Sequence, residues 1–154
     1  MSAAFPLMGH KGAGERFLRA RNSGRLHHGW IFQGPSGIGK SIFARRVAGL
    51  MLGASSLDAD KMDETMQLIQ SGGHPDLKWI ERGLNDKGKL RQDITVDQIR
   101  DLNQFFHLRP ALAGWRVGII DALDEMNVSG MHELLKTLEE PTRNALLILI
   151  SHST

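Results

Sequence analysis

The run GPSGIGKS at positions 34–41 constrains this chain more than any other part of its sequence. It matches the pattern Gly-x-x-x-x-Gly-Lys-Ser/Thr of a phosphate-binding loop, between a short apolar stretch at 30–32 and helically spaced apolar residues from 40 to 52. Glycines let such a loop wrap a phosphate chain, and the following helix offers unpaired N–H groups and a favourable dipole. A chance glycine-rich turn is the alternative, and the flanking strand and helix patterns disfavour it. The residues that we predict to bind a nucleotide are Gly34, Pro35, Ser36, Gly37, Ile38, Gly39, Lys40 and Ser41.

Three polar side chains give this loop its expected chemistry. Lys40 would reach the β- and γ-phosphates, and the Ser41 hydroxyl would bind Mg²⁺. The apolar run at 117–120 ends in Asp121, which would bring a carboxylate to the carboxyl edge of a sheet, where ligands gather. Asp121 can hold Mg²⁺ through the water shell of the ion. We therefore predict ATP and Mg²⁺ as ligands, with Ser41 and Asp121 as the metal-binding residues.

The residue after Asp121 is Ala122, where hydrolytic relatives carry an acid that orients the attacking water. Asp124 and Glu125 follow, and we expect them to serve the first turn of a helix over 126–139. The sequence therefore predicts binding without efficient hydrolysis in cis. It assigns no catalytic residue, and an ATPase activity of the chain itself stays open.

Strand and helix patterns alternate along the chain, which favours a parallel sheet flanked by helices. A capping box, Thr95 with Gln98, starts one of the helices, and Pro110 is its expected stop. Residues 1–23 are expected to form a lead-in with a short helix, and residues 24–154 the nucleotide-binding domain. The expected strands are 30–32, 77–80, 117–120 and 145–150, and the expected helices are 40–52, 61–70, 95–110 and 126–139.

Composition excludes several other classes of protein. The 154 residues allow one domain, and the absence of cysteine excludes a disulfide scaffold and a cysteine-ligated zinc site. A net charge of +2 does not by itself indicate nucleic-acid binding. No apolar run approaches the ~20 residues of a membrane span, and the first residues do not resemble a signal peptide. We expect a cytoplasmic protein with no membrane partner.

Several stretches together resemble the AAA+ modules of bacterial DNA polymerase III clamp-loader subunits, and most of all the delta-prime family. The most specific of them is LLKTLEEP at 134–141; the others are RLHHGWIFQGPSGIGKSIFARRVA, GGHPDL at 72–77, ITVDQIR at 94–100 and VGIIDALDEMN. The resemblance implies a subunit of a pentameric ring that uses ATP to load a sliding clamp onto primed DNA. It implies gamma/tau and delta subunits as partners, with the clamp and primer–template DNA contacted through the assembled complex. It also implies that Ser151 is a nucleotide-sensing residue and that delta-prime is largely a stator.

The chain departs from the family pattern at three places. It lacks the four-cysteine zinc module, so no zinc is expected, and it has His132 and Glu133 where the family usually has Asn-Ala. It stops at Thr154, so the expected fold is a P-loop NTPase (AAA+) sheet truncated after the fourth core strand, with lid and collar domains absent. Residues 30–32 should then lie at an open sheet edge, and nucleotide affinity should be weak because the adenine pocket lacks its lid wall.

Other functions remain open at this point. A gamma/tau-like motor ATPase or another P-loop enzyme, such as a small-molecule kinase, is the main alternative, although residues 98–109 offer no cluster of substrate-binding charges. The second alternative is an adaptor protein that never binds nucleotide. Replacing Lys40 by alanine would separate these possibilities.

Overall fold

Four parallel strands form the centre of the structure, a computed structural model that describes residues 29–34, 39–57, 62–112, 114–139 and 143–152 together with Arg16 and Arg19. The predicted lead-in, as a whole, and Pro35, Ser36, Gly37 and Ile38 of the phosphate loop lie outside the described residues. The elements in chain order are β1 (Gly29–Gln33), α2 (Lys40–Leu52), α3 (Glu64–Ser71), β2 (Leu77–Ile80), α4 (Val96–His107), β3 (Arg116–Asp121), η1 (Leu123–Glu125), α5 (Val128–Glu139) and β4 (Ala145–Ser151).

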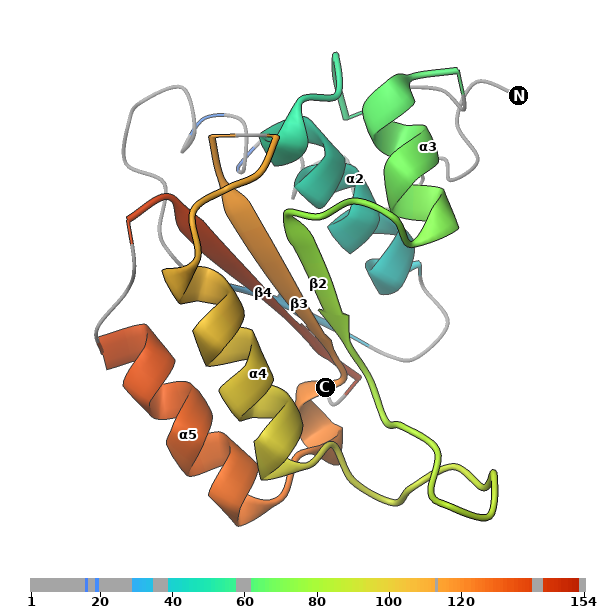
Figure 1. The fold of residues 1–154 in the computed structure, drawn as a ribbon, viewed down its shortest axis with the longest axis vertical. Helices are drawn as coiled ribbons and strands as arrows, with labels where there is room; N and C mark the ends of the chain where they lie inside the picture. Colours follow the sequence, from blue (N-terminus) through green and yellow to red (C-terminus); the bar gives the residue numbers. More distant parts are fainter. Residues whose placement is uncertain are drawn as a thin grey trace.

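The strand order in the sheet is β1-β4-β3-β2, and every neighbouring pair is parallel. Their carboxyl ends therefore lie at one edge of the sheet, the lower end in Figure 1, from which the β2–α4 connection also projects. The predicted parallel sheet flanked by helices is confirmed. None of the described helices is both long and apolar enough to cross a lipid bilayer.

Helices cover both faces of this sheet (Figure 1). α2 and α3 pack against one face, and α4 and α5 pack side by side against the other. All seven residues of β4 are buried, and they alternate between the two cores: Leu146 and Ile148 face the α2 side, and Leu147 and Leu149 face the α4 side. Burial on both faces explains why this strand is a continuous apolar run.

β1 lies at the edge of the sheet, as expected from the sequence. Among the described residues its strand partner is β4 alone, and the side chain of Ile31 is 57% exposed. On the inner side, Phe32 packs on Phe43 of α2 with ring centroids 4.8 Å apart. That contact packs the edge strand against α2.

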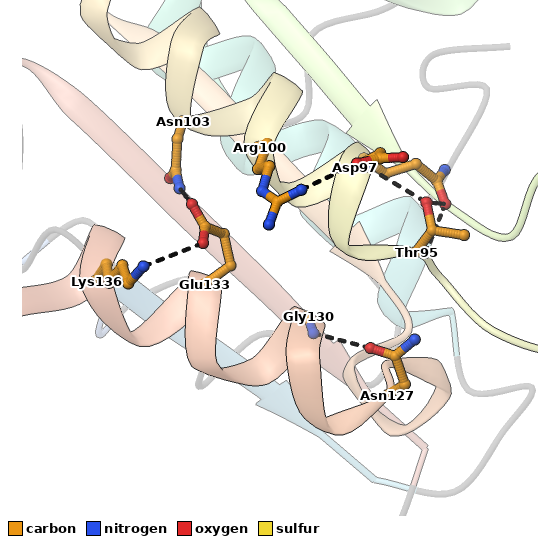
Figure 2. Close-up of polar contacts among 9 residues, drawn as sticks. Thr95, Asp97, Arg100, Asn103, Asn127, Gly130, Glu133 and Lys136 are labelled. Carbon is orange, nitrogen blue, oxygen red and sulfur yellow. Dashed lines mark hydrogen bonds and ion pairs between the residues drawn. The ribbon is translucent and has the colours of Figure 1, made fainter.

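Side-chain caps begin α3, α4 and α5, which is visible for α4 and α5 in Figure 2. The predicted capping box is present: the Gln98 backbone N–H donates to Thr95 Oγ1 at 3.4 Å, and the Thr95 N–H donates to Gln98 Oε1 at 3.0 Å. Asp63 accepts from the backbone N–H groups of Thr65 and Met66 at the start of α3. Helix α2 differs, because it begins after Gly39 and has no side-chain cap.

Asp124 and Glu125 lie in the first turn of a helix, as expected, but that helix is the short η1 and not the helix over 126–139. Both residues lie in η1, a separate turn, and α5 begins at Val128 with the Gly130 N–H donating to Asn127 Oδ1 at 2.8 Å. The physical reason is long-range pairing. The Ile94 N–H donates to the Glu125 carbonyl at 2.8 Å, which ties η1 to the chain before α4 and separates it from α5.

Candidate functional site at the carboxyl edge of the sheet

The strand register brings the ends of β1, β3 and β4 together. Gln33 pairs with Ser151, and Asp121 pairs with Ile150, so Ser151 lies between the start of the phosphate loop and the end of β3. The Gly34 N–H donates to the Ser151 carbonyl at 3.2 Å, which holds the start of the loop against β4. The structure therefore places Gly34, Asp121 and Ser151 at the same edge, where open α/β sheets bind ligands.

The far end of the loop leads into α2 through Gly39. Gly39 has φ +79°, in the left-handed region that favours glycine, and Lys40 is the first residue of the helix. The Lys40 side chain is only 3% exposed, and its ammonium donates to the Gly34 carbonyl. This contact joins the first residue of α2 to Gly34 at the end of β1 and keeps the lysine side chain away from solvent.

The amino terminus of α2 has the properties of an anion site. It has no side-chain cap and no acidic residue in its first turn, whereas α3 and α4 each begin with a capping side chain and an acid. N–H groups at a helix start favour anions, and the buried Lys40 adds a positive charge there. The Ser41 hydroxyl and the Asp121 carboxylate supply oxygen ligands of the kind that Mg²⁺ prefers. These residues fit a nucleoside triphosphate with its magnesium ion.

An open pocket of about 430 Å³ lies beside Asp121. Its polar lining combines the carboxylates of Asp121, Glu81 and Glu125 with the guanidinium of Arg82. Arg82 is already paired with Glu125, with 2.5 Å between Nε and Oε2. The pocket is therefore rich in acceptors near the predicted cation-binding carboxylate.

Ala122 is fully buried, with 0% of its surface exposed, and it brings no carboxylate to the edge. Glu125, three residues on, is engaged twice, since its Oε1 also accepts from the Ala122 N–H at 3.1 Å. Asp124 is engaged with β4. The two acids that follow Ala122 in the chain therefore each have a contact of their own, and Glu81 is the other carboxylate in the pocket beside Asp121.

Asp124 is a residue of the site whose role the sequence did not reveal. The Ser151 hydroxyl donates to its Oδ1 at 2.7 Å, and the His152 backbone N–H donates to its Oδ2 at 2.7 Å. We call Asp124, Ser151 and His152 the strand-end clasp, because they fasten η1 to the end of β4. Since a carboxylate only accepts, the one hydroxyl hydrogen of Ser151 is used by Asp124. In this arrangement Ser151 can offer another partner only its lone pairs.

Glu133, at one of the positions that departs from the family pattern, connects two helices. Asn103 Nδ2 on α4 donates to Glu133 Oε1 on α5 at 3.3 Å, and Thr137 Oγ1 donates to Asn103 Oδ1 (Figure 2 shows the first of these). Lys136 pairs with the other Glu133 oxygen at 3.4 Å. The contacts of Asn103 with Glu133 and Thr137 hold α4 against α5. α4 follows the connection from β2, and α5 follows η1, and both of these segments border the site.

The opposite edge of the sheet carries a buried ion pair. Asp76 has 0% of its side chain exposed and accepts from the backbone N–H groups of Ala111 and Leu112, at 2.6 and 2.8 Å. Arg116, at 3.7 Å from it, donates to the carbonyls of Leu108 and Arg109. Because this pair lies at the amino ends of β2 and β3, we assign it to the stability of the fold rather than to the site.

A larger pocket of about 680 Å³ lies between α2, α3 and β2. Its lining includes Arg45, whose guanidinium stacks 4.4 Å above the ring of Trp79, and none of the predicted site residues. It contains no described carboxylate to hold a cation. We take the carboxyl edge, and not the larger pocket, as the candidate site because the predicted binding residues Gly34, Asp121 and Ser151 converge there.

Comparison with known proteins identifies the family of this chain. A protein family described as DNA polymerase III, delta subunit, matches residues 9–154. The DNA polymerase III subunit delta' of Pseudomonas aeruginosa is 36% identical over 127 residues, which is 81% of this chain and 37% of that protein. The subunit tau of Escherichia coli is 31% identical over 129 residues, which is 82% of this chain and 19% of that protein.

The fold is also found in a solved structure. A DNA polymerase III, gamma subunit-related protein from Thermotoga maritima aligns with a TM-score of 0.52 at 16% identity, over 88% of this chain and 38% of that one. This likeness shows the fold alone. The chain spans little more than a third of the delta' relative and less of the tau relative. On the match over residues 9–154, this chain belongs to the DNA polymerase III delta-subunit family, and its predicted resemblance to delta-prime is confirmed.

Proposed function

We propose that this chain is the nucleotide-binding module of a delta-prime-type clamp-loader subunit that binds ATP with Mg²⁺. The observation that carries the proposal is the convergence of Lys40, the uncapped start of α2, Asp121 and Ser151 at one sheet edge. Lysine and the N–H groups at a helix start suit the phosphates, and hydroxyl and carboxylate oxygens suit the cation.

The module would bind ATP without hydrolysing it efficiently. Ala122 stands where a hydrolytic relative has an acid, and Glu125 is held by Arg82 and by the Ala122 backbone. Without an acid at position 122 to orient water, the expected role is that of a stator that supports a neighbouring motor subunit. In that role the nucleotide contributes to the shape of the subunit rather than to turnover.

The names of the relatives suggest the partners. Subunits delta', gamma and tau of DNA polymerase III are all similar to this chain, so we propose gamma/tau and delta subunits as its neighbours in a clamp loader. The sliding clamp and primed DNA would be contacted through the assembled complex. As part of this proposal, the protein is located in the cytoplasm, as expected from the sequence.

Calorimetry with a non-hydrolysable ATP analogue and Mg²⁺ tests the proposal, at millimolar ligand because weak binding is expected. Lys40→Ala should reduce the affinity by about tenfold or more, because it removes a charge-assisted contact to phosphate. Lys87→Ala is the matched control, since Lys87 is exposed in the β2–α4 connection. Equal affinities of the original chain and Lys40→Ala would refute nucleotide binding at this loop.

A motor ATPase is the second candidate, favoured by the 31% identity to the tau subunit of Escherichia coli. Release of phosphate from ATP separates it from a stator. We expect no turnover above the level of Lys40→Ala. Turnover that Lys40→Ala abolishes would establish the motor and overturn the stator role.

A further inference from the structure

The imidazole of His152 lies against the carboxylate of Asp121. His152 Nε2 is 3.4 Å from Asp121 Oδ1, and the two side chains are 36% and 21% exposed. Because a carboxylate only accepts hydrogen bonds, Nε2 must carry a hydrogen to make this contact favourable. The side chain next to the predicted cation-binding oxygen is thus a donor, which occupies space that the water shell of a cation needs.

The strand-end clasp fixes the position from which His152 reaches Asp121. The His152 backbone N–H and the Ser151 hydroxyl bind the two oxygens of Asp124, each at 2.7 Å. Asp124 lies three residues after Asp121, on η1. The backbone of His152 is therefore held at the end of β4, and rotation about the side-chain bonds is the motion that could take the imidazole away from Asp121.

The position of the imidazole beside Asp121 is unfavourable for one of its two ring nitrogens. Its Nδ1 is buried, and it has no hydrogen-bond partner among the residues that the structure describes. A buried polar atom without a partner destabilises the arrangement that buries it. Rotation of the side chain toward solvent would give Nδ1 a water partner and would release Asp121.

We propose that His152 is a positioning residue that holds Asp121 while no cation is bound, and that Asp121 exchanges the imidazole for the hydrated cation of a nucleotide. This role depends on the proposed nucleotide site. It predicts that displacing the imidazole from Asp121 lowers the nucleotide affinity only when Mg²⁺ accompanies the nucleotide. Binding of the metal-free nucleotide through Lys40 and the α2 N–H groups should not involve His152.

Calorimetry with the same ATP analogue, in Mg²⁺ and in EDTA, tests the role. His152→Ala should raise the affinity in Mg²⁺ by about three- to tenfold, the effect of one hydrogen bond, and leave the affinity in EDTA unchanged. His152→Gln, which can place an amide N–H near the same carboxylate, should restore the original affinity in Mg²⁺. His132→Ala is the matched control, because His132 is exposed on α5.

An NMR titration gives a second readout. The imidazole signal that disappears in His152→Ala should shift when analogue and Mg²⁺ are added and should stay in place with analogue and EDTA. Unchanged affinity of His152→Ala in Mg²⁺, or an equal change in Mg²⁺ and EDTA, would overturn the role of His152 while leaving nucleotide binding intact. Equal affinities of the original chain and Lys40→Ala in both buffers would instead overturn the nucleotide site, and the role of His152 with it.

Discussion

Replacing Asp76 by alanine removes the one carboxylate of a buried polar network at the amino edge of the sheet. Asp76 is completely buried and accepts two backbone hydrogen bonds, from Ala111 at 2.6 Å and Leu112 at 2.8 Å. It also neutralises Arg116, whose side chain is only 8% exposed. The variant would leave two N–H groups and one buried guanidinium without this partner.

The size of the effect follows from these contacts. Removing one partner of a buried ion pair costs about 3–5 kcal/mol. The lower end applies here, because Arg116 keeps the carbonyls of Leu108 and Arg109 as acceptors and because water can reach the exposed residues 111 and 112. We therefore expect a loss of about 3 kcal/mol, which lowers the Tm of a domain of this size by about 10 °C.

Thermal and urea unfolding followed by circular dichroism measure this loss. Asp76→Asn keeps one acceptor oxygen and should lose about half as much free energy. Asp101→Ala is the control, because Asp101 is exposed on α4, and it should change the stability by less than about 0.5 kcal/mol. A Tm of Asp76→Ala within 2 or 3 °C, on the order of 1 kcal/mol, of the original would refute the assignment of this pair to stability.

Three further changes test other parts of the fold. Burial lowers the pKa of His74 below 6.5, although the neighbouring Asp76 raises it, so the unfolded chain binds the proton first. The free energy of unfolding should therefore fall as the pH drops below about 6.5, and His74→Asn should flatten that part of the urea-midpoint profile. Gly118→Ala would place a Cβ 2.8 Å from Phe106 Cζ and should cost about 1–3 kcal/mol in urea unfolding. Thr95→Ala removes the cap of α4 and should cost about 1 kcal/mol by the same measurement.

Each of these changes has a result that would contradict its explanation. A pH profile that His74→Asn leaves unchanged would remove His74 from the explanation. Gly83→Ala adds a Cβ with nothing within 4 Å and should be close to neutral, so equal losses at positions 83 and 118 would contradict the packing argument. Thr95→Ser keeps the capping oxygen, and a loss as large as that of the alanine variant would exclude the cap as its cause.

Local patterns in the sequence were enough to predict most elements. α2 begins and ends where the apolar spacing and the stop at Gly53 predicted, and β2 spans the predicted residues 77–80. The capping box at Thr95 could be read because both partners lie within one helical turn. The helical spacing and the cap join residues close in the chain, whereas β2 was predicted from its apolar run although its partner β3 lies 40 residues later.

Contacts between segments that are distant in the chain could not be predicted from local sequence patterns. The boundary before α5 was misplaced because η1 is held by Ile94, about thirty residues earlier. The role of Asp124 depends on Ser151, 27 residues later, and no periodicity relates the two positions. No sequence pattern predicts the contact of His152 with Asp121 either. These two residues meet because the parallel strands β3 and β4 end at the same edge of the sheet.

The amino-acid sequence by itself determined the alternation of strands and helices, the phosphate-loop motif and the missing acid at Ala122, because these are properties of neighbouring residues and their chemistry. Only the tertiary structure decided which side chains meet at the carboxyl edge. The register of β1, β4 and β3 brings Gly34, Ser151 and Asp121 together there and adds Asp124 and His152 to them. Strand pairing across long loops is set by the packing of the whole core, so these partners appear when the sheet is assembled.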